Sequence, residues 1–198
     1  MAAPEPASDG GELLDAVADL GDALRQALEV STSTIVPAAE LREAAAGIRA
    51  LTAPLAAHPR PRDELPAVDD MTRALRVFNP VVGVGSAIAA PLDIRPDPEG
   101  GGVLARAVLG QRFEGPPTYL HGGISALLMD QVLGFAAIVA DRWGMTVDLD
   151  VRYRRPVPLH TPLRLTGRVA AAEGRRTTVV GAITTDEAPE AALVEATA

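Results

Sequence analysis

The sequence of 198 residues contains neither cysteine nor lysine. Without cysteine the chain cannot form a disulfide, a cysteine-ligated zinc site or a thiolate nucleophile. Histidine occurs only three times, and no spacing of histidines suggests a metal-ligand cluster, so we expect neither a metal site nor a resident cofactor. All 18 basic residues are arginines, a bias from which we infer no function.

Long apolar runs and an excess of basic charge are also missing. No stretch approaches the roughly 18 apolar residues of a membrane span, and residues 1–11 lack the basic start and apolar run of a secretory signal. The 26 acidic residues give a formal net charge of −8, which disfavours general binding to nucleic-acid phosphates. We therefore expect a soluble, cytoplasmic protein without a nucleic-acid partner.

The first part of the chain is acidic and has a helical pattern. Residues 1–11, rich in small residues and proline, predict a flexible tail. Residues 12–57 predict a helical extension of two amphipathic helices, the second over 38–57, where Pro54 should kink or end it. Seven acids against three arginines in this extension argue against a DNA-reading role. The proline-rich residues 58–75 predict a linker.

Residues 76–198 alternate short apolar runs with turns around one long helical pattern. We expect a hairpin first, then a helix over 121–143 that is buried on most sides. Residues 146–153 alternate apolar and polar side chains and predict a half-exposed antiparallel strand. The order predicts an α+β domain in which an antiparallel sheet wraps around a long central helix. The hairpin is expected from the apolar runs of residues 77–94 and 103–109. Further strands are expected over 146–153, 163–170 and 177–184, and residues 191–197 could form a last strand.

Three motifs follow one another in this domain. The first, QRFEGPPTYLHGGISALLMD, covers residues 111–130, and the second, TVDLDVRYRRPVPL, covers residues 146–159. The third is Gly174 with Arg175 and Arg176. In this order and spacing they resemble the hotdog-fold acyl-CoA thioesterases, especially the branch that contains the phenylacetate-pathway thioesterases and thioesterase superfamily member 4. The resemblance covers residues 76–198 and implies a hotdog fold.

The histidine and two glycines that open the long helix are candidate catalytic residues. A helix N-terminus offers unpaired backbone N–H groups and the positive end of the helix dipole, which suit an oxygen acquiring negative charge. Glycine lets a thioester carbonyl come close to that backbone. We expect the N–H of Gly122, alone or with Gly123, to be the oxyanion donor. His121 either assists by hydrogen bonding or serves as a cap or packing residue.

Asp130 interrupts the most apolar helix of the protein, where a carboxylate is desolvated unless it has a role. A solvent-facing aspartate or a helix-end ion pair is the alternative. The resemblance implies that this carboxylate activates a water molecule or attacks the thioester carbonyl directly. It also implies that Thr146, contributed by a neighbouring subunit, helps to orient the water. Thr146 could otherwise be an ordinary β-branched strand residue.

Seven arginines and one acid lie between residues 151 and 180. A solvated strand face would explain several of them, but guanidinium groups also bind phosphates, and coenzyme A carries phosphates at one end. The resemblance implies that the loop after the 146–153 strand and the following hairpin bind that end. The candidate residues are Arg152, Arg154, Arg155, Arg164, Gly174, Arg175 and Arg176.

Two positions depart from the family pattern. Thr118 stands where close relatives usually have glycine, and Glu114 stands where some relatives place an amide near the thioester. These departures concern the polar support of the carbonyl and leave the predicted base unaffected.

Together, these residues favour an acyl-CoA thioesterase that produces a free acid and coenzyme A. Coenzyme A is then part of the substrate, and no other cofactor is expected. A non-catalytic module that binds acyl-CoA is the alternative. Because a single hotdog sheet leaves an edge strand and half a site, we expect a homodimer or a dimer of dimers.

Overall fold

The computed structural model describes residues 9–70, 76–90, 92–97 and 101–198, so most of the predicted tail and part of the predicted linker lie outside the described residues. The helices are α1 (Asp9–Ser33), α2 (Ala38–Ala56), α3 (Gly122–Val139) and the short 3-10 helix η2 (Gln111–Phe113). The strands are β1 (Asp93–Asp97), β2 (Gly102–Val108), β3 (Asp150–Tyr153), β4 (Pro162–Glu173), β5 (Arg176–Thr185) and β6 (Val194–Thr197).

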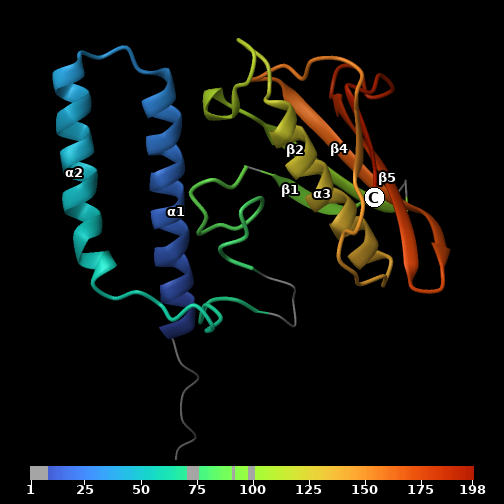
Figure 1. Ribbon diagram of the computed structural model, residues 1–198, viewed down its shortest axis with the longest axis horizontal. Helices are drawn as coiled ribbons and strands as arrows, with labels where there is room; N and C mark the ends of the chain where they lie inside the picture. The colour runs from blue at the N-terminus through green and yellow to red at the C-terminus, as the bar shows by residue number, and fades with distance from the viewer. Residues whose placement is uncertain (1–8, 71–75, 91, 98–100) are drawn as a thin grey trace, which may run out of the picture.

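The strands form one antiparallel sheet in the order β1-β2-β4-β5-β6-β3, and α3 packs against it (Figure 1). One side of α3 is buried on the sheet, and the helix ends at Val139. The prediction of burial on most sides and of a helix up to residue 143 is therefore wrong, because a single sheet covers only one face of the helix. The predicted α+β architecture, with an antiparallel sheet and a long central helix, is confirmed. The buried residues of α3 are Ser125, Leu128, Met129, Val132, Leu133 and Ala136.

Two glycines let α3 lie close to the sheet. Gly167 of β4 and Gly181 of β5 are cross-strand partners. A Cβ atom at Gly167 would lie 3.1 Å from the carbonyl oxygen of Val132, and one at Gly181 would lie 2.9 Å from a methyl group of Leu133. A side chain at Gly167 would displace α3 slightly, and one at Gly181 would collide first with the carbonyl oxygen of Thr166 in β4 and then with α3, so the glycine pair favours the close approach of helix and sheet.

By length and composition, α3 is also long and apolar enough to cross a membrane, with a mean hydropathy of 1.7 over 18 residues. The prediction that no stretch approaches a membrane span overlooked this. The core helix of a globular domain passes the same test, and α3 has a buried face on the sheet and a carboxylate, Asp130, near its middle. Its hydropathy therefore follows from its place in the core.

The strand predicted over 146–153 is shorter in the structure. Only β3 pairs, with β6, while residues 142–149 have no regular structure. The side chains of Met145 and Val147 are each 91% exposed. The reason is that β3 is an edge strand of the sheet and β6 spans only four residues, so no described part of the chain pairs with the beginning of the predicted strand.

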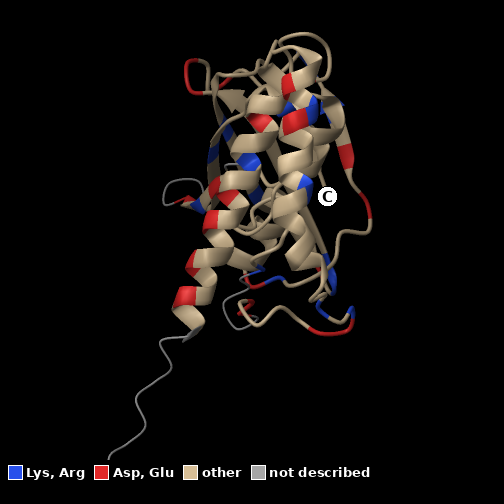
Figure 2. Ribbon diagram, turned by 90° about the vertical axis from the view of Figure 1, so that its left-hand side faces the viewer, with Lys and Arg blue, Asp and Glu red and all other residues tan. Residues whose placement is uncertain are grey.

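The predicted N-terminal helices are present, with small differences at their ends. The first helix begins at Asp9, three residues before its predicted start at Glu12. The second helix ends at Ala56, two residues after Pro54. α1 packs beside η2 and against the turns of residues 77–90, whereas α2 has no buried residue (Figure 1). Acidic residues recur along α1 (Figure 2).

The hairpin predicted ahead of the long helix is formed by β1 and β2. Residues 77–90, expected to contain part of it, form turns instead. Val77, Val81 and Ala89 are nevertheless buried, so this segment contributes to the core without joining the sheet.

Candidate active site

Two hydrogen bonds hold one peptide unit at the N-terminus of α3. His121 is the N-cap residue, and its Nδ1 accepts a bond of 3.0 Å from the N–H of Gly123. The hydroxyl of Tyr153 donates a bond of 2.9 Å to the carbonyl oxygen of Gly122. Because Nδ1 is the acceptor, the neutral imidazole carries its proton on Nε2. The peptide unit between Gly122 and Gly123 is therefore fixed from both sides.

The N–H of Gly122 remains available to a ligand. No described residue accepts a hydrogen bond from it, whereas the N–H of Gly123 is taken by His121. A Cβ atom at Gly122 would first meet the ring of Tyr153, at 3.4 Å. Of the three residues predicted here, the geometry leaves Gly122 free to donate to a ligand oxygen at the positive end of the helix dipole, and it makes His121 a cap.

Asp130 is half-buried, and its Oδ1 atom is buried without a hydrogen-bond partner among the described residues. A buried polar atom that lacks a partner lowers stability, so such atoms are rare and often functional. Asp130 follows Gly122 by eight positions, which is about 12 Å along a helix. One carbonyl group cannot contact both residues of the same chain.

A groove of about 730 Å³ runs along one flank of α3. Its α3 wall is formed by Leu133, Gly134 and Ala137, which share a helix face with Asp130 because they follow it by three, four and seven positions. Asp130 itself lies one turn beyond this wall. Residues 141–147 and 174–177 contribute further lining, so Thr146, Gly174, Arg175 and Arg176 gather in the groove.

The predicted phosphate-binding arginines do not form one cluster in a single chain. Arg164 lies nine residues along β4 from Glu173, where the turn to Arg175 and Arg176 begins, which corresponds to about 30 Å of strand. Arg175 and Arg176 are exposed and have no ionic partner among the described residues. Both follow Gly174 directly, at the turn between β4 and β5, where the φ of Gly174 is +58°.

The other predicted arginines have partners. Arg152 lies 3.5 Å from Asp150 and Arg164 lies 4.0 Å from Asp186. Arg154 makes two bonds to Glu195, of 2.9 and 2.7 Å, and Arg155 donates to the carbonyl oxygen of Ala192. These groups are less available to a phosphate than Arg175 and Arg176.

The two positions that depart from the family pattern lie in the loop before α3. Thr118 has a φ of +70°, in the left-handed region that glycine adopts without strain. The carboxylate of Glu114 accepts a bond of 2.7 Å from the N–H of Thr118 and is thereby directed at its own loop. No group of three or more His, Asp or Glu side chains suited to a metal ion occurs in the described part of the chain.

Three residues that hold the site or the turn before its loop could not be predicted from the sequence. Tyr153 lies in the predicted strand of residues 146–153, and it holds Gly122 from a position 31 residues later in the chain. Glu29 and Arg112 link α1 to the turn that leads into the site loop. None of these contacts has a local sequence signal, because the partners are distant in the chain.

Comparison with known proteins identifies relatives of the second part of the chain. The thioesterase superfamily matches residues 118–192. The acyl-coenzyme A thioesterase THEM4 of Xenopus laevis is 36% identical over 67 residues, which are 34% of this chain and 30% of that protein. THEM4 of Mus musculus is 32% identical over 67 residues, covering 34% and 29%. The chain therefore matches less than a third of the length of these curated relatives.

A solved structure extends the comparison to the N-terminal helices. A crystal structure described as a thioesterase superfamily protein is 31% identical to this chain, covers 99% of it and is itself covered to 95%, with a TM-score of 0.79. The match includes both α1 and α2, so the helical extension is shared with that relative. Since sequence and fold agree over nearly the whole of both proteins, this chain belongs to the thioesterase superfamily and has its hotdog fold.

Proposed function

We propose that the protein is an acyl-CoA thioesterase in which Asp130 is the catalytic carboxylate. The observation that carries the proposal is the buried Oδ1 of Asp130, which has no partner among the described residues and lies on a mostly apolar helix. A carboxylate in such surroundings is suited to accept a proton from water or to attack a carbonyl. The similarity to the acyl-coenzyme A thioesterase THEM4 supports the same substrate class.

The distance of about 12 Å between Gly122 and Asp130 along α3 requires that each site combine two chains. In a dimer with twofold symmetry, Gly122 of one chain can face Asp130 of the other, which produces two equivalent sites. The unpaired edge of β3 and the exposed Met145 and Val147 support an interface on this side of the sheet. A dimer of dimers retains the same pair of sites.

The proposed reaction transfers the acyl group from sulfur to oxygen. The thioester carbonyl accepts a hydrogen bond from the N–H of Gly122, which stabilises the oxyanion as a new carbon–oxygen bond forms. Asp130 takes the proton of the attacking water, or forms that bond itself and is released by water in a second step. Thr146 orients the water. The carbon–sulfur bond breaks, and coenzyme A leaves as a thiol after taking up a proton.

The nucleotide end of coenzyme A is proposed to bind at Arg175 and Arg176. Both side chains are exposed and without an ionic partner among the described residues, and they line the same groove as Thr146. Guanidinium groups pair with phosphate oxygens through two parallel hydrogen bonds. Arg152, Arg154, Arg155 and Arg164 would have to exchange a present partner, so we assign them at most a supporting role.

Release of free thiol from a panel of acyl-CoAs tests the proposal. We expect the wild-type protein to release thiol and Asp130→Asn to lose this activity while keeping its fold and its affinity for acyl-CoA. Asp148→Asn, which removes the same charge from an exposed position, is the matched control and should retain activity. Tight binding by the wild type without thiol release would instead identify an acyl-CoA-binding module.

A further inference from the structure

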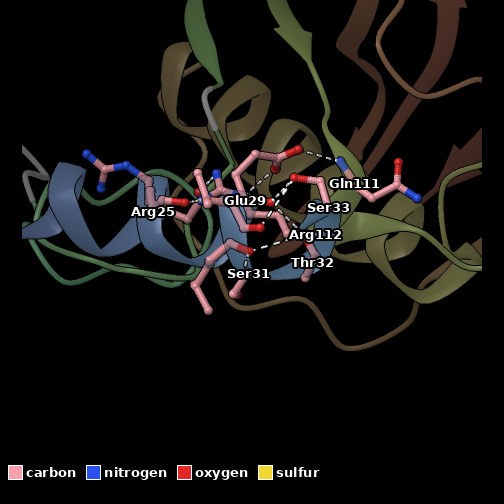
Figure 3. A network of polar contacts seen from close by, with 10 residues as sticks. Arg25, Glu29, Ser31, Thr32, Ser33, Gln111 and Arg112 are labelled. Carbon is pink, nitrogen blue, oxygen red and sulfur yellow. Dashed lines mark hydrogen bonds and ion pairs between the residues drawn. The ribbon is translucent and has the colours of Figure 1, made fainter. Parts of the chain in front are cut away.

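The helix α1 is connected to the turn before the site loop by a carboxylate (Figure 3). Glu29 accepts a hydrogen bond of 2.7 Å from the backbone N–H of Gln111, the first residue of η2. The other oxygen of Glu29 lies 3.9 Å from Nε of Arg112. A carboxylate that accepts from a backbone N–H makes a stronger bond than a neutral acceptor does.

Gly110 provides the space for this carboxylate. A Cβ atom at Gly110 would collide with the carboxylate group of Glu29. The backbone of Gly110 has φ −95° and ψ −170°, which any residue can adopt. The absence of a side chain is therefore explained by the approach of Glu29 and not by backbone strain.

Arg112 also connects the turn at residues 110–113 to α1. Only 10% of its side chain is exposed, and it donates to the carbonyl oxygens of Arg25 and Ala89 at 3.2 and 3.1 Å. Its guanidinium lies 4.6 Å from the centre of the ring of Phe113. Burial lowers the pKa of Arg112, and the nearby charge of Glu29 acts in the opposite direction. The charge of Glu29 therefore offsets part of the effect of burial on the guanidinium of Arg112.

The rest of α1 is fitted closely to the neighbouring turns. Arg25 donates to the carbonyl oxygens of Val84 and Ser86, at 2.7 and 3.0 Å. A Cβ atom at Gly21 would collide with the carbonyl oxygen of Val84. Helix α1 is thus fixed by backbone acceptors and close packing, in contrast to α2, which has no buried residue.

The turn that Glu29 holds leads directly to the cap of α3. Phe113, the last residue of η2, accepts a bond of 2.9 Å from the N–H of His121. Between them the chain folds back on itself, with Glu114 and Leu120 as an antiparallel bridge. Two residues therefore separate the backbone held by Glu29 from the backbone that carries the cap residue of α3.

We propose that α1 acts as a strap that sets the position of His121 and Gly122, with Glu29 and Arg112 as positioning residues. This inference rests on the proposed function, because it assigns a catalytic consequence to the geometry of Gly122. It gives the N-terminal extension a role in the chemistry through the turn at 110–113, although no residue of α1 is proposed to touch the substrate.

Three variants of the strap and one control test this inference. Glu29→Ala removes the acceptor, Glu29→Gln keeps one acceptor oxygen but loses the charge, and Gly110→Ala displaces the carboxylate by steric contact. Asp19→Asn removes an exposed acid from the same helix and serves as the control. For each variant we would measure kcat and KM for acyl-CoA hydrolysis and the amide hydrogen exchange of residues 111–125.

We expect Glu29→Ala and Gly110→Ala to lower kcat about tenfold with KM nearly unchanged, since small displacements of a catalytic group are costly in rate. The kcat of Glu29→Gln should lie between those of these two variants and that of the wild type, and the kcat of Asp19→Asn should match that of the wild type. Exchange should become faster at 111–125 but not in β4 and β5. An unchanged kcat in Glu29→Ala, or faster exchange throughout the sheet, would overturn the strap.

The hydrogen-exchange measurement also separates this inference from the proposed function. If the wild-type protein hydrolyses no acyl-CoA, the proposed function fails, and the strap is then judged by exchange alone. Unchanged exchange at 111–125 in Glu29→Ala would refute it in that case as well. Faster exchange confined to this segment would support the strap as a structural device independent of thioester hydrolysis.

Discussion

The hydroxyl of Tyr153 donates a hydrogen bond to the carbonyl oxygen of Gly122, and the Nδ1 atom of His121 accepts one from the next N–H along the chain. One peptide unit is thus held by a strand residue and by the helix cap at once. The preceding N–H lies in the adjacent peptide plane, which is joined to this unit through the φ and ψ rotations at Gly122. With Gly122 in the first turn of α3, holding this unit restricts those rotations, and we expect Tyr153 to influence the geometry of the proposed oxyanion donor.

Tyr153→Phe should reduce activity and stability by similar, modest amounts. The ring keeps its place against Gly122, but the loss of the hydroxyl lets the peptide unit turn, so kcat should fall about three- to tenfold. The free energy of unfolding should fall by about 1 kcal/mol, the usual value of one hydrogen bond. Tyr119→Phe, at a partly exposed tyrosine of the site loop, is the control. Thiol release and thermal unfolding of both variants check the prediction.

Gly122→Pro removes the proposed oxyanion donor with little effect on the helix. Position 122 is the first residue of α3, where proline is favoured, and His121 before it has an extended ψ of 132° that is compatible with a following proline. We expect kcat to fall by about 10²- to 10³-fold. Gly122→Ala keeps the N–H and should lose much less. Equal activities of the two variants would show that this N–H is not the donor.

A mixing experiment tests whether each site is shared between chains. Gly122→Pro and Asp130→Asn should each be inactive alone. After subunit exchange in equal amounts, half of the dimers contain one chain of each kind, and each of these has one intact site, so about a quarter of the wild-type activity should return. If Gly122 and Asp130 of the same chain acted together, mixing would restore nothing. The measurement is thiol release before and after exchange.

Thr118→Gly should stabilise the protein. The φ of +70° at Thr118 is strained for a β-branched residue, and glycine relieves this strain at the cost of extra freedom in the unfolded chain. The net gain should be about 0.5–1 kcal/mol in the free energy of unfolding. Thr161→Gly, at a threonine without a positive φ, should be destabilising. Thermal unfolding of the two variants should therefore show midpoint shifts of opposite sign.

Much of the fold could be predicted because it depends on local patterns. The apolar positions of α3 and the alternation in β4 and β5 each reflect a face buried within the same chain. Residues 146–148 belong to the same alternation but are exposed in the structure, whereas Leu149 packs against the core. The alternation indicates that one face is to be covered, and it does not indicate which residues cover it.

The candidate site was predicted where its residues are close in sequence. His121, Gly122 and Asp130 share one helix and could be placed by motif and periodicity. The arginines of residues 152–176 are also close in sequence, but the antiparallel strands carry them to opposite ends of the sheet. Glu29 and Tyr153 could not be assigned to the site, because their partners lie 82 and 31 positions away.

The contact between Glu29 and Gln111 also has a consequence for the order of folding. It closes a loop of 82 positions, which carries an entropic cost of about 4 kcal/mol. During synthesis α1 leaves the ribosome before η2, and the N–H of Gln111, which donates to Glu29, emerges only 82 positions later. The helix must remain unattached until then, so docking of α1 is expected to be a late step, and the entrance to α3 reaches its final geometry only when α1 docks.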